Sequence, residues 1–348
     1  MHPDVLRAQA QAMMGHRGPV IKEIMSDLQA GLKDVFCTTR PVLISTSSAT
    51  GLMEAAVRNG ARSRVLSLVN GAFSERFTKI SRACGFEVET LEVEWGQAIK
   101  PDAVKKRLAK NDFDTVTVVH SETSTGALNP ISDISKVVQE MEDVVLIVDS
   151  VTGVGGVEVQ TDEWDLDFVL TGSQKALALP PGLAFGVSSP RLIERSKTAL
   201  MKGVYFDLDL FTKHIENLQT PNTPALSLIY ALAEQLRRIA TEGMTGRWER
   251  HLAMARRCSE WVDSMRNEHG VNLSILAAKG ERSPTVTCVV LPNEIDGPSI
   301  VSEMKNLGFV IGEGYGKLKN NTLRIGHMGD HRLSELDVVL EALQGILK

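Results

Sequence analysis

The chain lacks any continuous run of about 18 apolar residues, the length that a transmembrane helix needs, so we expect no membrane contact. Cysteines are few. Cys37, Cys84, Cys258 and Cys288 are far apart and form no CxxC pair, which is typical of free thiols in a reducing cytosol. The eight histidines form no HExxH-type cluster, and we predict no metal site. The start of the chain, Met1–Asp4, lacks the basic-then-apolar pattern of a secretory signal. These absences favour a cytoplasmic protein.

An excess of positive charge is also missing. The 348 residues carry a formal net charge of −5, which argues against a general polyanion binder, so we expect no nucleic-acid partner. Hydrophobic residues make up 43% and charged residues 23% of the chain. This is an ordinary globular composition, and the chain is long enough for two hydrophobic cores.

Between residues 43 and 190, apolar strand-like runs alternate with helix-like segments, and this pattern indicates a mostly parallel sheet covered on both faces. Beyond the short run at 43–44, the expected strands are Val65–Val69, Glu87–Val93, Phe113–Val119, Val144–Asp149, Asp167–Leu170 and Leu183–Val187. The helix-like segments are Gly51–Asn59, Glu75–Cys84, Pro101–Ala109 and Ile131–Met141. The fold class is therefore α/β.

The polar stretch 243–247 is the expected domain boundary. Residues 1–242 form the expected large domain. Within it, residues 191–223 show no clear periodicity, and Pro224 then opens a long helix. Residues 243–348 form a small α+β domain. Its expected elements are helices Trp248–Glu268, Pro298–Leu307 and Leu333–Leu347, and strands Pro284–Leu291, Phe309–Ile311 and Thr322–Ile325.

A single lysine follows the apolar strand Asp167–Leu170. Lys175 stands between small polar residues and a turn at Pro180–Gly182. A lysine at a strand end can lose solvation and become a usable amine, as a Schiff base to an aldehyde cofactor requires. A solvated surface lysine is the alternative interpretation.

Two further features belong with this lysine. Asp149 ends a buried apolar strand, at the edge where open α/β sheets bind ligands, and its carboxylate could hold a cationic ring nitrogen or cap the next segment. Ser48, Ala49 and Thr50 begin a helix after a short strand, where free N–H groups and hydroxyls make either a phosphate cradle or a plain N-cap. Pyridoxal 5'-phosphate (PLP) requires an amine, an anion and a phosphate site together.

The chain resembles the class V aminotransferases of PLP fold type I, closest to the alanine–glyoxylate, serine–glyoxylate and serine–pyruvate group. The segments that carry the resemblance are Gly15–Arg17, Ser48–Gly51, Asn70–Phe73, His120–Gly126, Val148–Val151, Gly172–Ala176, Thr220–Pro224 and Leu323–Gly329. The resemblance implies a large domain with a mostly parallel seven-stranded sheet plus a small C-terminal α+β domain. It also implies that residues 1–40 contribute to the dimer or to the small domain.

The resemblance implies a role for each matching residue. Lys175 is the Schiff-base lysine and proton carrier, and Asp149 pairs with the pyridine nitrogen. Ser48, Ala49 and Thr50 hold the phosphate, with alanine at 49 where many relatives have glycine. The remaining cofactor contacts are Phe73 and Val151 on the two ring faces, Thr123 and Gln174 on the phenolic-oxygen side, and Asn222 and Thr223 from the neighbouring subunit. Arg324 takes the substrate's α-carboxylate, and no role is assigned to Arg17.

The expected activity is PLP-dependent transamination with ping-pong kinetics by a homodimer with a composite active site. No second arginine is evident for a side-chain carboxylate, so we expect alanine or serine as donor and glyoxylate or pyruvate as acceptor. The chain starts just after the place where relatives carry a Pro-Gly-Pro segment near the substrate.

A class V lyase such as a cysteine desulfurase is one alternative, although Phe73 stands where such an enzyme usually has histidine. A non-catalytic PLP-fold partner protein is the other. The Gly312–Lys317 segment is interpreted as a mobile loop.

Overall fold

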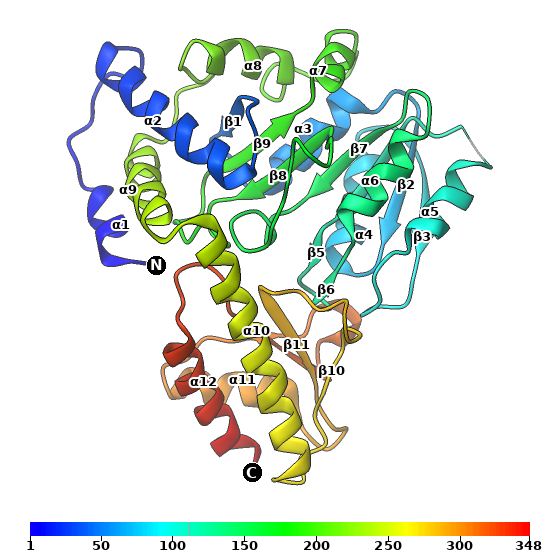
Figure 1. Ribbon diagram of the computed structural model, residues 1–348, viewed down its shortest axis with the longest axis vertical. Coiled ribbons are helices and arrows are strands. Elements are labelled where there is room, and N and C mark those ends of the chain that lie inside the picture. Colours follow the sequence, from blue (N-terminus) through cyan, green and yellow to red (C-terminus); the bar gives the residue numbers. More distant parts are fainter. Residues whose placement is uncertain (111) are drawn as a thin grey trace.

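A seven-stranded sheet lies at the centre of the larger part of the computed structural model, which describes residues 1–110 and 112–348 (Figure 1). The strand order is β1-β9-β8-β7-β4-β2-β3. The strands are β1 (Val42–Ser45), β2 (Arg64–Val69), β3 (Glu87–Glu92), β4 (Thr115–Val119), β7 (Val145–Asp149), β8 (Phe168–Gly172) and β9 (Ala184–Ser188). The neighbours from β8 to β3 are parallel, and β9 is antiparallel to β8 and β1. The mostly parallel α/β sheet is confirmed.

The antiparallel direction of β9 has a local cause. Parallel neighbours need a long crossover, usually a helix, whereas the segment between β8 and β9 is a loop without a helix. The chain therefore turns back beside β8. This loop carries Lys175.

Helices cover both faces of the sheet, as right-handed crossovers require. On one face α3 (Ala49–Gly60) contacts α4 (Ala72–Ala83) and α7 (Pro190–Lys197). On the other, α5 (Pro101–Leu108) contacts α6 (Ile131–Gln139). The remaining helices of this part are α1 (Pro3–Ala8), α2 (Pro19–Phe36), α8 (Leu208–Glu216) and α9 (Leu226–Glu242). Residues 191–223, which show no clear pattern in the sequence, hold most of α7 and all of α8.

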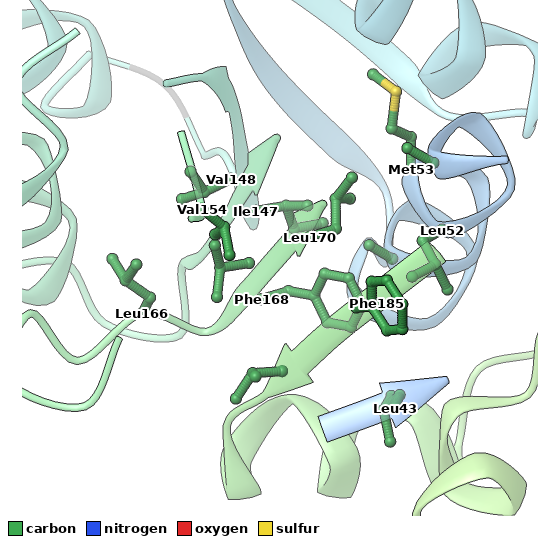
Figure 2. Packing of buried hydrophobic residues seen from close by; sticks show 14 of the residues in the cluster. Leu43, Leu52, Met53, Ile147, Val148, Val154, Leu166, Phe168, Leu170 and Phe185 are labelled. Carbon is green, nitrogen blue, oxygen red and sulfur yellow. The ribbon is translucent and has the colours of Figure 1, made fainter. Parts of the chain in front are cut away.

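Interlocking aromatic and aliphatic side chains fill the core between α3 and the sheet. Figure 2 shows Leu52 of α3 beside Phe185 of β9, with Phe168 of β8 next to it; all three are fully buried. Gly186 gives this packing room, because a Cβ there would lie 2.8 Å from the Phe168 ring. Burial on both faces explains why these strands read as continuous apolar runs.

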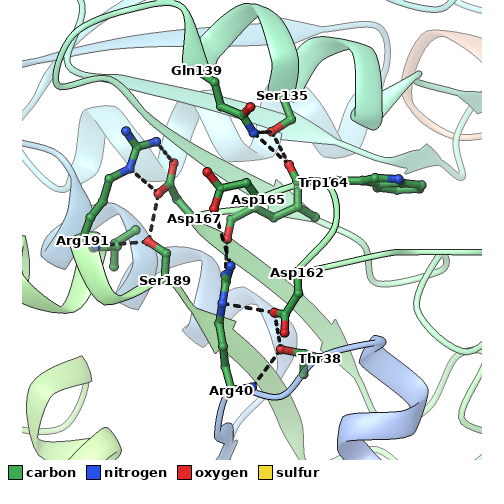
Figure 3. A network of polar contacts seen from close by, with 12 residues as sticks. Thr38, Arg40, Ser135, Gln139, Asp162, Trp164, Asp165, Asp167, Ser189 and Arg191 are labelled. Carbon is green, nitrogen blue, oxygen red and sulfur yellow. Dashed lines mark hydrogen bonds and ion pairs between the residues drawn. The ribbon is translucent and has the colours of Figure 1, made fainter.

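A polar network fixes the opposite end of β8 from the lysine loop (Figure 3). The buried Asp167 carboxylate accepts two hydrogen bonds from the Arg191 guanidinium, at 2.6 and 2.5 Å, and one from the Leu146 N–H of β7. Below it, Arg40 pairs with Asp162, which also accepts a hydrogen bond from the Thr38 hydroxyl. The start of the strand is therefore anchored before the chain reaches the site.

A second, smaller unit lies at the far end of the long helix α10 (Met244–Asn267) (Figure 1). It has its own hydrophobic cluster. Its strands are β10 (Ser274–Ile275), β11 (Val286–Val290), β12 (Gly312–Glu313) and β13 (Thr322–Gly326), and its helices are α11 (Gly297–Asn306) and α12 (Leu333–Leu347). The strand expected near Phe309–Ile311 is displaced along the chain, since β12 begins directly after Ile311. The Gly312–Lys317 segment is not a plain loop, because it holds β12 and the start of the 3-10 turn η1 (Gly316–Leu318).

The polar stretch 243–247, where we expect the domain boundary, holds the N-cap Gly243 and the first turn of α10. Arg247 within it is 1% exposed. None of the helices among the described residues combines the length and apolar character that a bilayer crossing requires.

Candidate active site

A cavity of about 220 Å³ lies where the carboxyl ends of β1, β4, β7 and β8 meet. Because these ends lie at one edge of the sheet, the loops that follow them converge. Nine of the twelve predicted site residues line the cavity: Ser48, Ala49, Thr50, Phe73, Thr123, Asp149, Val151, Gln174 and Lys175. Five further lining residues were not predicted: Met53, Arg76, Val119, Ser121 and Thr152.

Asp149 is the last residue of β7 and is 4% exposed. One carboxylate oxygen accepts a hydrogen bond from the Val151 N–H at 2.9 Å. No lysine or arginine of the described chain forms an ion pair with it. Burial, with a smaller effect of the nearby Glu122 carboxylate, raises the Asp149 pKa to about 7. A buried carboxylate that has no cationic partner is suited to pair with a protonated ring nitrogen.

Lys175 lies in the loop between β8 and β9, and Ser173 holds this loop in shape. The Ser173 hydroxyl donates to the Pro180 carbonyl at 2.7 Å and accepts from the Leu183 N–H at 3.2 Å. The Lys175 amine makes no hydrogen bond or ion pair with the residues that the structure describes. Burial is the main cause that lowers its pKa, and the Arg324 guanidinium adds to the effect. A desolvated, unpaired amine of this kind is suited to nucleophilic attack on an aldehyde.

The N-terminus of α3 opens into the cavity. Ser48 is the N-cap residue, and its side chain makes no capping hydrogen bond. The N–H groups of Ala49 and Thr50, in the first turn, have no intrahelical partner, as at every helix start. Both residues line the cavity, so the helix offers an anion free N–H donors and the positive end of its dipole.

A buried carboxylate that the sequence analysis did not assign holds the aromatic side of the site. Glu122 is fully buried and accepts hydrogen bonds from the N–H groups of Phe73 and Ser74, at 3.1 and 2.9 Å. It also accepts from Ser124. Since Phe73 and Ser74 begin α4, Glu122 caps that helix and fixes the position of the Phe73 ring in the cavity wall.

Arg324, on β13 of the smaller unit, lies beside the cavity and is not part of its lining. Its guanidinium donates to the Glu313 carbonyl at 2.7 Å and to the Thr123 carbonyl at 3.4 Å. It also lies over the Tyr315 ring, 5.6 Å from the centroid. Arg324 therefore reaches from the small sheet to the loop after β4.

Sequence reasoning missed Arg76, which lines the cavity from α4. It stands three residues after Phe73, and this spacing places both side chains on one helix face, which is the signal that could have revealed it. Its guanidinium lies 4.9 Å from the Phe73 ring centroid and donates to the Tyr315 hydroxyl at 3.0 Å. A second arginine, which the sequence did not reveal, therefore lines the cavity.

Other predicted residues lie elsewhere. Asn222 and Thr223 do not line the cavity of their own chain; the Asn222 carbonyl accepts from Thr220 at 2.7 Å. Arg17 is exposed and outside the cavity lining. Cys84, Cys258 and Cys288 are buried free thiols, while Cys37 is half-buried. Within the described ranges no cluster of histidine, cysteine and acidic side chains is arranged to hold a metal ion.

The donor and acceptor groups of the cavity fit PLP. A carboxylate without a cation matches the pyridine nitrogen, a desolvated amine matches the aldehyde, and an open helix N-terminus matches the phosphate. The fold and this set of groups define a PLP-dependent enzyme of fold type I.

Comparisons with known proteins narrow this class. The family model "Aminotransferase class-V" matches residues 5–314. An uncharacterized aminotransferase of Methanocaldococcus jannaschii is 37% identical, over 99% of this chain and 90% of its own length. The serine–glyoxylate aminotransferase of Arabidopsis thaliana is 31% identical, over 99% and 87%. The solved alanine–glyoxylate aminotransferase from Nostoc sp. has a TM-score of 0.93 at 30% identity, over 100% of this chain and 92% of that one. The chain belongs to the class V aminotransferase family, and its cofactor is PLP.

Proposed function

We propose that this enzyme moves the amino group of a small amino acid, alanine or serine, to a 2-oxo acid, glyoxylate or pyruvate, in a ping-pong reaction. The observation that carries the proposal is the pair formed by Lys175 and Asp149. The amine and the carboxylate face one cavity, and neither has an oppositely charged partner within hydrogen-bonding distance among the residues that the structure describes. The names of two relatives, a serine–glyoxylate and an alanine–glyoxylate aminotransferase, support the choice of substrates.

When bound, PLP supplies an aldehyde and a ring that accepts the electrons released at the substrate's α-carbon. With the cofactor bound, Lys175 would hold this aldehyde in the resting enzyme. Once the amino donor has displaced it, the free Lys175 amine would serve as the proton carrier for the substrate's α-carbon. Asp149 keeps the ring nitrogen protonated, because its carboxylate has no competing cation.

The remaining residues orient the reacting groups. Phe73 and Val151 would contact the two faces of the ring, and Thr123 and Gln174 would bond its phenolic-oxygen side. Ser48, Ala49 and Thr50 hold the phosphate at the start of α3. Arg324 binds the substrate's α-carboxylate through a planar guanidinium that matches it in bidentate fashion.

We also propose a cytoplasmic homodimer in which Asn222 and Thr223 reach the phosphate of the neighbouring subunit. An exposed apolar residue near the phosphate end of the site supports this arrangement. Val204 is 79% exposed, and the next residue, Tyr205, donates to the Thr46 carbonyl just before the cradle. Such exposed apolar side chains are typical of an interface. The division into domains 1–242 and 243–348 remains part of this proposal, together with a contribution of residues 1–40 to the dimer or the small domain.

A desulfurase activity is not supported by the structure. Cys288, the thiol nearest the site, is fully buried in β11, and its Sγ contacts the Ser124 carbonyl. Burial raises its pKa to about 11. A desulfurase needs a mobile, ionised cysteine, and this one is fixed and protonated.

A half-reaction assay tests the proposal. Alanine or serine, added without an acceptor, should shift the cofactor's absorption band and release one equivalent of 2-oxo acid. Borohydride reduction of the resting enzyme should attach the cofactor to the peptide that contains Lys175, as identified by mass spectrometry. Lys175→Ala should lose this attachment and slow turnover by roughly 10²- to 10⁴-fold, the usual contribution of a proton-transferring side chain. No spectral change with either donor would refute the proposed donors.

A further inference from the structure

Arg76 has no anionic partner among the described residues, although it lines the active-site cavity. Its polar contact is the neutral Tyr315 hydroxyl, at 3.0 Å. The carboxylate of the nearby Glu122 is already occupied, because its oxygens accept hydrogen bonds from the N–H groups at the start of α4 and from Ser124. An unpaired guanidinium that faces a cavity is a binding group for a carboxylate or phosphate.

Tyr315 brings Arg76 close to Arg324. The Arg76 guanidinium donates to the Tyr315 hydroxyl, while the Arg324 guanidinium lies over the ring of the same tyrosine. The Phe73 and Tyr315 rings stack, with their centroids 5.4 Å apart. Two arginines thus contact the same tyrosine, one at its hydroxyl and one at its ring, and this arrangement suits a short ligand with two carboxylates.

We propose that Arg76 binds the distal carboxylate of a four-carbon dicarboxylic substrate, an α-amino acid of aspartate length or the matching 2-oxo acid, while Arg324 binds its α-carboxylate. This inference rests on the proposed transamination, and it adds a substrate class to the small donors named above. Tyr315 positions the Arg76 guanidinium for this contact.

The cofactor phosphate is the competing partner for Arg76. The phosphate has its own donors at the start of α3, where the N–H groups of Ala49 and Thr50 are free. Arg76 lies on another helix, and Tyr315 joins it to Arg324 at the substrate end of the site. The geometry therefore favours the substrate over the phosphate.

Binding of unreactive acids to the holoenzyme tests this subsite. Succinate has two carboxylates, and butyrate has the same chain length with one. Calorimetric titration should show succinate binding more tightly than butyrate, and Arg76→Gln should weaken succinate by about 10- to 100-fold, the loss expected for one charge-assisted interaction. Arg76→Lys should restore part of the loss. Arg82→Gln removes the same charge from the exposed side of α4 and should leave the succinate preference intact.

Kinetic measurements with aspartate and alanine as amino donors provide a second test. Aspartate should convert the wild-type cofactor, and Arg76→Gln should reduce kcat/KM for aspartate at least tenfold more than for alanine. Equal binding of succinate and butyrate to the wild type would overturn the inference. So would an equal loss for both acids in Arg76→Gln, or a loss of cofactor affinity, which would assign Arg76 to the phosphate. If no donor reacted with the wild type, the proposed function would fail, while the succinate titration would still decide the role of Arg76.

Discussion

At the scale of single residues, the unpaired carboxylate of Asp149 makes the stability of the cofactor-free protein depend on pH. Its pKa is about 7 in the folded chain, against an ordinary 3.8, so between these values the folded state binds more protons than the unfolded state. The unfolding free energy of the apoenzyme should therefore fall as pH rises through this window, by on the order of 4 kcal/mol in total.

Urea denaturation of the apoenzyme at pH 5 and pH 8 measures this effect. Asp149→Asn removes the titrating group, so the variant should lose less stability than the wild type between the two pH values. Asp27→Asn, an exposed position on α2, controls for the change in charge. Equal losses in the wild type and in Asp149→Asn would contradict the prediction.

At the same scale, the sequence analysis found the residues whose chemistry shows in a short segment. Asp149 ends one apolar strand, Lys175 comes shortly after another, and the cradle follows β1. Arg76, Glu122 and Tyr315 escaped it because their contacts depend on how α4, the loop after β4 and the small sheet meet. Glu122 and Phe73 lie far apart in the chain, and no local pattern links a carboxylate to a distant helix start.

At the scale of elements, the approach of Glu122 to the start of α4 requires glycine at position 71. A Cβ on Gly71 would overlap with the Glu122 side chain and with the Ser124 hydroxyl. Gly71→Ala should therefore push the Glu122 carboxylate away from the Phe73 and Ser74 N–H groups and lower the unfolding free energy by about 1–3 kcal/mol. Chemical denaturation measures the loss.

The matched control is Gly246→Ala, where a Cβ meets no atom within 4 Å and the residue lies inside α10. Alanine is the better helix former, so this variant should gain roughly 0.5–1 kcal/mol. Cofactor affinity should fall in Gly71→Ala and stay unchanged in Gly246→Ala, because only the former shifts the Phe73 ring. A Gly71→Ala variant as stable as the wild type would rule out the crowding argument.

The elements themselves were partly predictable. Strands buried on both faces appear as apolar runs, and their positions agree with β2, β7 and β8 to within a residue or two. Helices α7 and α8 were missed, because each is only two turns long and the segment around them mixes apolar and charged residues. The reversal of β9 depends on the loop before it rather than on its own composition.

At the scale of the whole molecule, one buried arginine ties the two units together. Arg247 donates to the Ala176 carbonyl at 2.7 Å, next to Lys175, and pairs with Asp330 at 3.1 Å in the loop before α12. It also pairs with Glu242 at 2.9 Å. Arg247→Met should lower the unfolding free energy by about 3–5 kcal/mol, because it leaves two acids without this buried partner.

Guanidinium-induced unfolding checks this prediction. Arg237→Met is the control, since Arg237 is exposed and pairs with Glu234 on the surface of α9. Its loss should stay below about 1 kcal/mol. Comparable losses in the two variants would show that burial adds nothing to the Arg247 contacts.

The placement of the cavity along the chain has a consequence for synthesis. Its lining runs from Ser48 to Lys175, and the core that supports it is complete by Ile239, whereas Arg324 belongs to the last strand. A growing chain still attached to the ribosome has therefore already made every group that lines the cofactor cavity. The proposed recognition of the substrate's carboxylate by Arg324 has to wait until translation is almost finished.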